Sequence, residues 1–277
     1  MFQYSYDSLV YHGESIEESV RRVARYGYDA LELVGEPAQY DVSEVRRLTA
    51  EYGIGVSSIC SIYHQDRDLS HPEASKREQG VEYVKRVAEL AAETGAPVMI
   101  VAPAANMRIH PFTSAGEEWK LAAESIRAGG EYAASLGVKL CIEAWNRYET
   151  YMLNRVDQCL DMMRQVDLPN VGVMGDTFHM NLEEADIADA IRKCGSSLFH
   201  IHLADSNRAA PGTGHLAFRP VLQALKDIDY SGFLTFELLP AAADPFGVMR
   251  TGGGEMFLNK YTEMAIQYTK ELERTLY

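Results

Sequence analysis

Four apolar runs in the second half of the chain end in, or carry, side chains that bind metal ions or move protons. Two of them end at Glu143 and Asp176, the third carries His200 and His202, and the fourth ends at Glu237. Three carboxylates that face one another raise one another's pKa values unless a cation neutralises them. These residue types therefore indicate a divalent metal site, provided that the fold brings the run ends together.

The mixture of donors favours some metals over others. Carboxylate oxygens with a single imidazole suit Mn²⁺, Mg²⁺ or Co²⁺ better than a structural Zn²⁺, which prefers thiolates and histidines. One acid at a strand end is more often a helix cap, so the hypothesis depends on the succession of run ends. His200 and His202 lie two positions apart and would share one face of a regular strand. Their spacing cannot choose between them.

A repeat of eight β-rich apolar runs must position these groups. The runs cover residues 2–6, 30–34, 54–60, 98–102, 138–143, 171–176, 198–203 and 233–237. Amphipathic segments with helical spacing follow them, at residues 15–26, 42–52, 73–94, 117–136, 155–166, 182–194, 218–228 and 255–276. Each of the first four helices meets a glycine that favours a left-handed stop, namely Gly27, Gly53, Gly95 and Gly137.

The unbroken strand and helix repeat predicts an α/β fold in which eight parallel strands close into a (β/α)8 TIM barrel. No proline-rich or low-complexity linker divides the sequence, so we expect a single domain over residues 1–277. A doubly wound open sheet is the alternative. In a barrel the carboxyl ends of the strands build the active site, and the four run ends would then converge.

Composition excludes several classes of protein. The chain has 277 residues and a net charge of -14, from 26 Lys plus Arg and 40 Asp plus Glu. At 47% hydrophobic and 24% charged residues it is typical of a globular protein and not of a disordered chain. An acidic surface opposes nucleic-acid partners, because these require basic groups to displace phosphate counterions.

The cysteines and the amino terminus bear on the compartment. The four cysteines form no C-x-x-C pair and are interpreted as reduced core thiols; they are Cys60, Cys141, Cys159 and Cys194. The first residues lack a basic segment followed by an apolar one, and no run approaches the roughly 18 apolar residues of a membrane span. The sequence therefore predicts a cytoplasmic protein without a membrane partner.

Three stretches resemble a known enzyme group. They are residues 141–154 (CIEAWNRYETYMLN), 175–192 (GDTFHMNLEEADIADAIR) and 200–214 (HIHLADSNRAAPGTG). They are similar to the ketose 3-epimerases, the D-tagatose and D-psicose 3-epimerase group within the sugar phosphate isomerase/epimerase superfamily of xylose-isomerase-like barrels. The resemblance covers residues 138–240 most clearly.

The resemblance implies a metal site and its ligands. In the family, a Glu, an Asp, a His and a Glu from successive strands hold Mn²⁺ or Co²⁺, with Mg²⁺ as a further candidate. The matching positions are Glu143, Asp176, His202 and Glu237, which selects His202 over His200. The family also implies a homo-oligomer, either a dimer or a tetramer.

The resemblance further implies a sugar substrate bound by Glu149, His179 and Arg208. Arginine and histidine donors suit hydroxyls or an enediolate oxygen. Glu143 and Glu237 would exchange a proton with the substrate through a cis-enediolate, which predicts an isomerase that epimerises a ketose at C3. The alternative is an aldose-ketose or sugar phosphate isomerase on the same metal site.

Three loops depart from the family pattern. One of them, residues 237–247 (ELLPAAADPFG), carries no basic residue. Arg108 and His110 replace an aromatic-rich stretch, and they could face a distal hydroxyl, a carboxylate, a phosphate or solvent. The loop at residues 211–218 (PGTGHLAF) has only His215 as a potential cation, which favours a free ketose over a sugar phosphate. An abasic-site endonuclease is disfavoured by eight histidines and the net charge, and a sugar-binding barrel without activity by the two retained glutamates.

Overall fold

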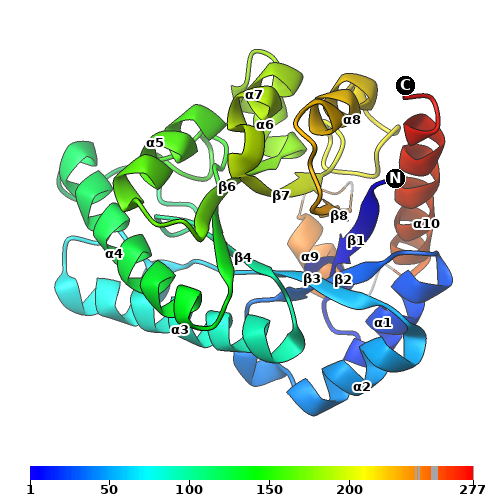
Figure 1. The fold of residues 1–277 in the computed structure, drawn as a ribbon, viewed down its shortest axis with the longest axis horizontal. Coiled ribbons are helices and arrows are strands. Elements are labelled where there is room, and N and C mark those ends of the chain that lie inside the picture. The colour runs from blue at the N-terminus through cyan, green and yellow to red at the C-terminus, as the bar shows by residue number, and fades with distance from the viewer. Residues whose placement is uncertain (241, 243, 251–254, 277) are drawn as a thin grey trace.

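Eight parallel strands close into a barrel in the computed structural model, which describes residues 1–240, 242, 244–250 and 255–276. The strands follow one another around the barrel in chain order, and β8 pairs with β1 (Figure 1). They are β1 (Gln3–Asp7), β2 (Ala30–Val34), β3 (Gly55–Cys60), β4 (Val98–Val101), β5 (Lys139–Ile142), β6 (Val171–Asp176), β7 (Leu198–Leu203) and β8 (Phe233–Phe236). The predicted (β/α)8 barrel is confirmed, and closure excludes the open sheet. The single domain over residues 1–277 stays a prediction.

Helices surround the barrel and cover its outer face (Figure 1). They are α1 (Ile16–Arg25), α2 (Val42–Tyr52), α3 (Ala74–Thr94), α4 (Ala115–Ser135), α5 (Val156–Val166), α6 (Thr177–Glu183), α7 (Ile187–Cys194), α8 (Phe218–Asp227), α9 (Pro245–Arg250) and α10 (Glu255–Glu273). The short α9 was not expected from the sequence. Among the described helices, none is both long enough and apolar enough to cross a membrane.

The predicted stops after the first four helices are confirmed. Gly27, Gly53, Gly95 and Gly137 have φ values of 80°, 70°, 82° and 74°. These values lie in the left-handed region that a residue with a Cβ seldom adopts. The glycines therefore turn the chain from each helix into the next strand.

The single helix expected over residues 182–194 is wrong. The chain forms α6 directly after β6 and then a second helix, α7. Glu184 leaves the helical conformation with a ψ of 137°, and the Asp186 side chain accepts a hydrogen bond from the Asp189 N–H to begin α7. Aspartate is a common N-cap residue, so Asp186 could have indicated the start of a second helix. The helical spacing of apolar residues across the whole segment favoured one continuous helix instead.

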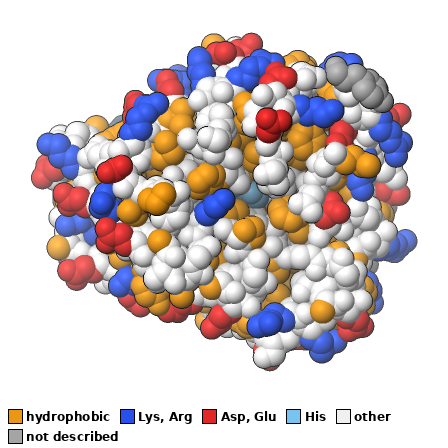
Figure 2. All heavy atoms as spheres, viewed as in Figure 1, with side chains coloured by type: hydrophobic (Ala, Val, Ile, Leu, Met, Phe, Trp, Pro, Cys, Tyr) orange, Lys and Arg blue, Asp and Glu red, His pale blue; other side chains and the backbone are white. Residues whose placement is uncertain are grey.

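The hydrophobic core has an outer and an inner part. The outer part packs the helices against the strands, and a separate cluster inside the barrel joins five buried side chains: Cys60, Val98, Ile100, Cys141 and Met174. All four cysteines are buried and free, as predicted. Figure 2 shows the molecular surface in the view of Figure 1, with charged groups concentrated around the rim of the molecule.

Candidate active site

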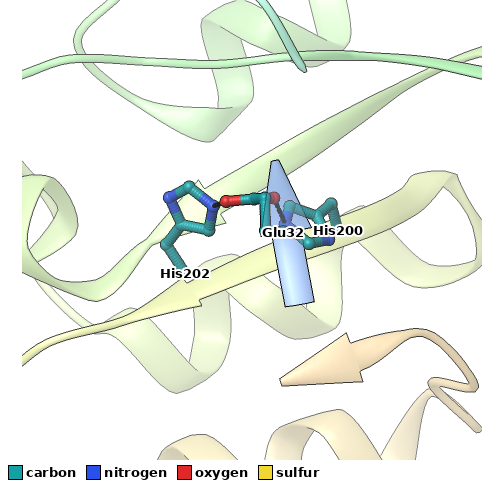
Figure 3. A group of neighbouring side chains, drawn as sticks. All are labelled: Glu32, His200 and His202. Carbon is teal, nitrogen blue, oxygen red and sulfur yellow. Dashed lines mark hydrogen bonds and ion pairs between the residues drawn. The ribbon is translucent and has the colours of Figure 1, made fainter. Parts of the chain in front are cut away.

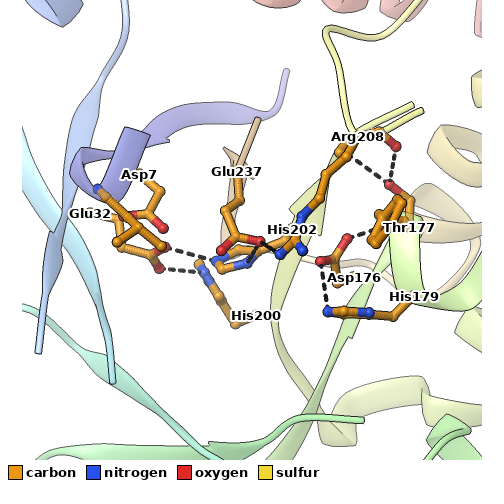
Figure 4. A network of polar contacts seen from close by, with 12 residues as sticks. Asp7, Glu32, Asp176, Thr177, His179, His200, His202, Arg208 and Glu237 are labelled. Carbon is orange, nitrogen blue, oxygen red and sulfur yellow. Dashed lines mark hydrogen bonds and ion pairs between the residues drawn. The ribbon is translucent and has the colours of Figure 1, made fainter. Parts of the chain in front are cut away.

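The structure brings the four predicted metal ligands together at the carboxyl ends of β5 to β8. Glu143 and Glu237 follow β5 and β8, Asp176 ends β6, and His202 lies in β7. All four are buried. Ligand atoms of Glu143, Asp176 and His202 lie within 4.8 Å of one another. Glu237 Oε2 lies 3.7 Å from His202 Nδ1, so the fourth carboxylate adjoins the group (Figure 4).

Two buried atoms in this group are unpaired. Asp176 Oδ1 accepts a hydrogen bond from the Phe178 N–H at 2.8 Å, while Asp176 Oδ2 has no hydrogen-bond partner among the described residues. His202 Nδ1 is likewise buried and without such a partner in the described part of the chain. A buried polar atom without a partner is unfavourable. A divalent cation would satisfy both atoms, and three carboxylates with one imidazole suit such an ion. The residues present therefore fit the expected metal.

The two glutamates have opposite electrostatic environments. Burial, together with the nearby Glu237 and Asp176 carboxylates, raises the pKa of Glu143 to about 8. Burial and Glu237 also raise the pKa of Asp176 to about 7. The pKa of Glu237 is instead lowered, because Arg208 and His202 outweigh the effect of burial. Without a metal, the site near neutral pH therefore pairs a protonated carboxyl with an ionised one.

Glu32 is a buried member of the site that the sequence analysis did not identify. It lies in β2 and faces the histidines of β7 (Figure 3). Glu32 Oε1 lies 2.8 Å from His202 Nε2, and Glu32 Oε2 lies 2.8 Å from His200 Nε2. Although burial opposes it, the two histidines lower the pKa of Glu32 to about 2. The sequence does contain one indication of this residue, because Glu32 is a single acid within the apolar run 30–34.

Asp7 is a second carboxyl that the sequence analysis missed. It ends β1, one residue beyond the predicted strand, and is fully buried. Its Oδ1 accepts a hydrogen bond from the Leu9 N–H at 2.8 Å, and its Oδ2 has no hydrogen-bond partner among the described residues. One of its oxygens lies within 4.8 Å of Cys60 Sγ and a Glu237 oxygen. Burial, together with the nearby Glu32 and Glu237 carboxylates, raises the pKa of Asp7 well above its usual value, which favours the neutral carboxyl.

A cavity of about 520 Å³ opens above the ligands. Glu143 and Glu237 line it, and so do the three predicted substrate residues, Glu149, His179 and Arg208. Apolar and aromatic side chains complete the walls; among them are Leu9, Ile62, Tyr63, Met107 and Trp145. A largely apolar cavity with a few convergent polar groups is typical of a small-molecule site.

Arg208 links the cavity wall to Glu237. Its Nη2 donates a hydrogen bond to Glu237 Oε2 at 2.9 Å, and its Nη1 lies 3.7 Å from Glu149 Oε1. The guanidinium lies 4.8 Å from the centre of the Phe178 ring, and the backbone φ is 59°. The Arg208 N–H donates to the Asp205 carbonyl at 2.8 Å. This turn directs the side chain into the site.

His179 has a defined tautomer. The Asn146 backbone N–H donates to His179 Nδ1 at 3.2 Å, so Nε2 carries the proton when the ring is neutral. Burial and the charge of Arg208 lower the pKa of His179 well below its usual value, which favours that neutral form. His179 Nε2 lies 3.6 Å from Asp176 Oδ2. The ring therefore presents one N–H donor to the cavity.

Arg108 and His110, from the loop after β4, do not line this cavity. The Arg108 side chain is mostly buried, with its Nε 2.8 Å from Asp68 Oδ2 and its Nη1 paired with Glu118. The guanidinium lies 4.7 Å from the ring centre of Phe112. His110 is exposed. Arg108 therefore fastens the loop after β4 to neighbouring elements, a role outside the expected alternatives of substrate group or solvent.

Comparison with known proteins finds similar sequences and a similar fold. A 3-dehydro-D-guloside 4-epimerase of Escherichia coli strain K12 is 30% identical over 238 residues, which cover 84% of this chain and 90% of that protein. A D-psicose 3-epimerase of Ruminiclostridium cellulolyticum is 30% identical over 268 residues, covering 91% and 90%. The crystal structure of D-psicose 3-epimerase with D-tagatose from Clostridium cellulolyticum H10 superposes with a TM-score of 0.86 at 25% identity, covering 98% and 99%.

These relatives are sugar epimerases, so the expected resemblance and the isomerase class are confirmed. The model of one protein family, described as Xylose isomerase-like TIM barrel, matches residues 20–250. That match includes the strand ends that carry Glu143, Asp176, His202 and Glu237. The chain therefore belongs to the Xylose isomerase-like TIM barrel family.

Proposed function

We propose that this chain epimerises a free ketose at C3, with a divalent metal, Mn²⁺ before Co²⁺ or Mg²⁺, held by Glu143, Asp176, His202 and Glu237. The observation that carries the proposal is the convergence of Glu143 and Glu237 on one cavity, which the predicted substrate residues also line. Epimerisation requires one group that removes a proton and another that returns one to the opposite face. Glu143 and Glu237 would fill these two roles, one accepting a proton and the other donating one.

The chain's own groups account for the proton transfers. An ionised glutamate accepts the C3 proton, and the protonated glutamate donates a proton to the other face of the same carbon. His179 and Arg208 donate hydrogen bonds to the oxygens on which negative charge develops. When bound, the metal supplies a positive charge that polarises the substrate carbonyl. Glu149 accepts hydrogen bonds from Asn146 Nδ2 at 2.8 Å and Asn106 Nδ2 at 3.2 Å, which orient it toward substrate hydroxyls.

The loop after β7 supports a substrate without phosphate. Phosphate sites in barrels use free backbone N–H groups in this region. Here the N–H groups of Gly212 and Leu216 donate to the Asp205 carboxylate at 2.8 Å and 3.0 Å. Of the described residues that line the cavity, Arg208 alone is a lysine or arginine, and Glu237 pairs with it. A phosphate dianion would therefore find few unpaired donors.

A second candidate is epimerisation at C4 of a 3-keto sugar glycoside. The name of the Escherichia coli relative, 3-dehydro-D-guloside 4-epimerase, favours it. The chemistry is the same, because C4 is adjacent to a carbonyl at C3 and its proton is removed through an equivalent enediolate. The cavity of about 520 Å³ falls in the usual range of ligand sites, about 300–1,000 Å³.

A substrate panel tests the proposal. The purified chain is incubated with Mn²⁺ and with fructose, tagatose, psicose, their phosphates and 3-keto glucosides, and the products are separated by chromatography. We expect interconversion of free ketoses that differ at C3. Turnover of only 3-keto glycosides would favour the second candidate. Turnover confined to phosphates, or formation of aldoses, would replace both candidates with a sugar phosphate or aldose-ketose isomerase.

We propose a cytoplasmic enzyme that forms a dimer or a tetramer and binds neither nucleic acid nor membranes. Sedimentation of the purified chain would test the assembly, and a monomer at micromolar concentration would contradict it.

A further inference from the structure

We propose that Glu32 is a positioning residue for the metal centre, which holds His202 in the tautomer whose Nδ1 is free to bind the ion. The inference rests on the proposed metal site and extends it to a residue of the opposite side of the barrel. Glu32 lies in β2, whereas the four proposed ligands come from the β5 to β8 side. Figure 4 shows Glu32 and His200 on the side of His202 that faces away from Asp176.

The hydrogen bond to Glu32 defines the state of the His202 ring. The carboxylate oxygen accepts, so His202 Nε2 must carry a proton. The other ring nitrogen, Nδ1, has no hydrogen-bond partner among the described residues and lies 3.7 Å from Oε2 of Glu237, another proposed ligand. A histidine that binds a metal through one nitrogen commonly donates its other N–H to a carboxylate. The geometry at His202 fits that arrangement.

Glu32 is held in place by more than one donor. Its Oε2 lies 2.8 Å from His200 Nε2 and also accepts a hydrogen bond from Ser58 Oγ. Ser58 Oγ in turn lies 2.9 Å from Ser57 Oγ, which lies 2.6 Å from Ser5 Oγ. With both oxygens occupied, rotation of the carboxylate breaks at least one hydrogen bond. His200 therefore acts on the metal centre through Glu32.

Direct participation of Glu32 in binding or catalysis does not fit the structure. Glu32 is fully buried, and neither it nor His200 lines the cavity above the ligands. The cluster of Glu32, His200 and His202 is compact enough to hold an ion of its own. An ion there would have to displace N–H donors from both carboxylate oxygens, whereas the Asp176 and His202 atoms on the other side are unpaired.

The substitution Glu32→Gln tests the role while preserving the shape of the side chain. Glutamine offers one acceptor oxygen and an NH₂ group, so it cannot accept N–H donors from two imidazoles. One ring must then change its tautomer, and the negative charge beside His202 is lost. We expect Mn²⁺ to bind about 10–100-fold more weakly, the usual cost of losing such a partner. Glu32→Asp, which keeps the charge, should retain more of the affinity.

A matched control separates this effect from general loss of stability. Glu273 is also a buried glutamate with two acceptor roles, since it accepts from the Phe2 N–H at 2.7 Å and from Tyr4 Oη at 2.8 Å. It lies at the end of α10, outside the proposed site. Glu273→Gln should lower the melting temperature of the metal-free chain but leave its affinity for Mn²⁺ unchanged.

The measurement is titration of each metal-free chain with Mn²⁺, in which electron paramagnetic resonance reports the free ion. Weaker binding by Glu32→Gln than by Glu273→Gln supports the inference. Equal affinity of both variants and the parent chain contradicts it while leaving the metal site intact. A parent chain that binds no Mn²⁺ overturns both the site and the inference, and two tightly bound ions per chain would make Glu32 a ligand.

Nuclear magnetic resonance of the parent chain provides a test if Glu32→Gln does not fold. With ring-¹⁵N histidine and bound diamagnetic Mg²⁺, two-bond couplings report which nitrogen of each ring carries a proton. We expect Nε2 of His202 to be protonated. A proton on Nδ1 of His202 would contradict the proposed positioning.

Discussion

The interior of the barrel has two unlike sides. Toward β4, β5 and β6 it is filled by apolar side chains, among them Val98, Ile100, Cys141 and Met174. Toward β1, β2, β3 and β7 it contains a connected series of buried polar groups, which we term the interior polar column; its members are Ser5, Ser57, Ser58, Glu32 and His200. The side chains named on both sides are buried, but among these described residues only the column connects by hydrogen bonds, through Glu32, to His202.

The contrast indicates that the two sides of the interior have different functions. Apolar packing is nondirectional and stabilises the barrel, whereas a satisfied hydrogen-bond network fixes the orientation of its members. The polar column requires an irregular strand, because the pairing of β2 with β3 shifts register between Leu31 and Leu33. Adjacent residues Ser57 and Ser58 then both join the column. We infer that residues of β5 to β8 supply the ligands and that the interior polar column, from β1, β2, β3 and β7, orients them.

Removal of a ligand should have the largest effect. Asp176→Ala and His202→Ala each delete one of the two buried unpaired atoms, so Mn²⁺ affinity should fall further than the about 10–100-fold expected for an outer partner such as Glu32. Calorimetric titration after treatment with EDTA provides the measurement. If either variant binds Mn²⁺ as tightly as the parent chain, the substituted residue is not a metal ligand.

Loss of a proton-transfer group should have the next largest effect. Glu143→Gln and Glu237→Gln keep the side-chain shape but cannot exchange protons, so each should lower turnover at least about 100-fold. Metal content must be measured beside the rate, because both residues are also proposed ligands. Near-parent activity in either variant at full metal occupancy would eliminate the two-glutamate scheme.

The pH dependence of stability should show a smaller effect. The folded chain holds protons on Glu143, with a pKa of about 8, and on Asp176, with a pKa of about 7, that the unfolded chain has already released. Burial would lower the pKa of His202, but the nearby Glu32 and Glu237 carboxylates raise it well above its usual value. The folded chain therefore also holds a proton on His202 that the unfolded chain releases over this range. The free energy of unfolding of the metal-free chain should therefore decrease as pH rises from about 6.5 to about 8.

Chemical denaturation across this range measures that slope. Saturating Mn²⁺ should stabilise the chain more at pH 8 than at pH 6.5, because binding displaces these protons. Glu143→Gln, which cannot titrate, should have a shallower slope in the absence of metal. A metal-free chain whose stability rises over this interval would contradict the assigned protonation states.

The sequence predicted the strands of both sides but the chemistry of only one. Periodicity and helix stops located all eight strands to within a residue or two, because each apolar run is short and is flanked by a clear helical pattern. The proposed ligands on the β5 to β8 side could be predicted because Glu143 and Glu237 close apolar runs. The choice of His202 over His200 came from the resemblance, and it agrees with the unpaired Nδ1 of His202.

Glu32 and the polar column were missed for a physical reason. Serines and a single acid inside apolar runs are compatible with many environments, and only the register between strands decides whether they meet. The distance between Glu32 and His200 in the sequence is 168 positions, so no local pattern relates them. Arg108 was also misjudged, because its partners Asp68 and Glu118 lie on other segments that the fold brings together.

Hydrogen exchange at the substrate carbon tests the central claim most directly. The Mn²⁺-loaded chain is incubated in D₂O with fructose, tagatose and psicose, and deuterium is located by nuclear magnetic resonance and mass spectrometry. Proton transfer between Glu143 and Glu237 predicts deuterium at C3, and Glu237→Gln with its metal bound should incorporate it far more slowly. Exchange only at C1 would contradict the account. So would interconversion of C3 epimers without exchange of any carbon-bound hydrogen, under conditions where the glutamates equilibrate with solvent.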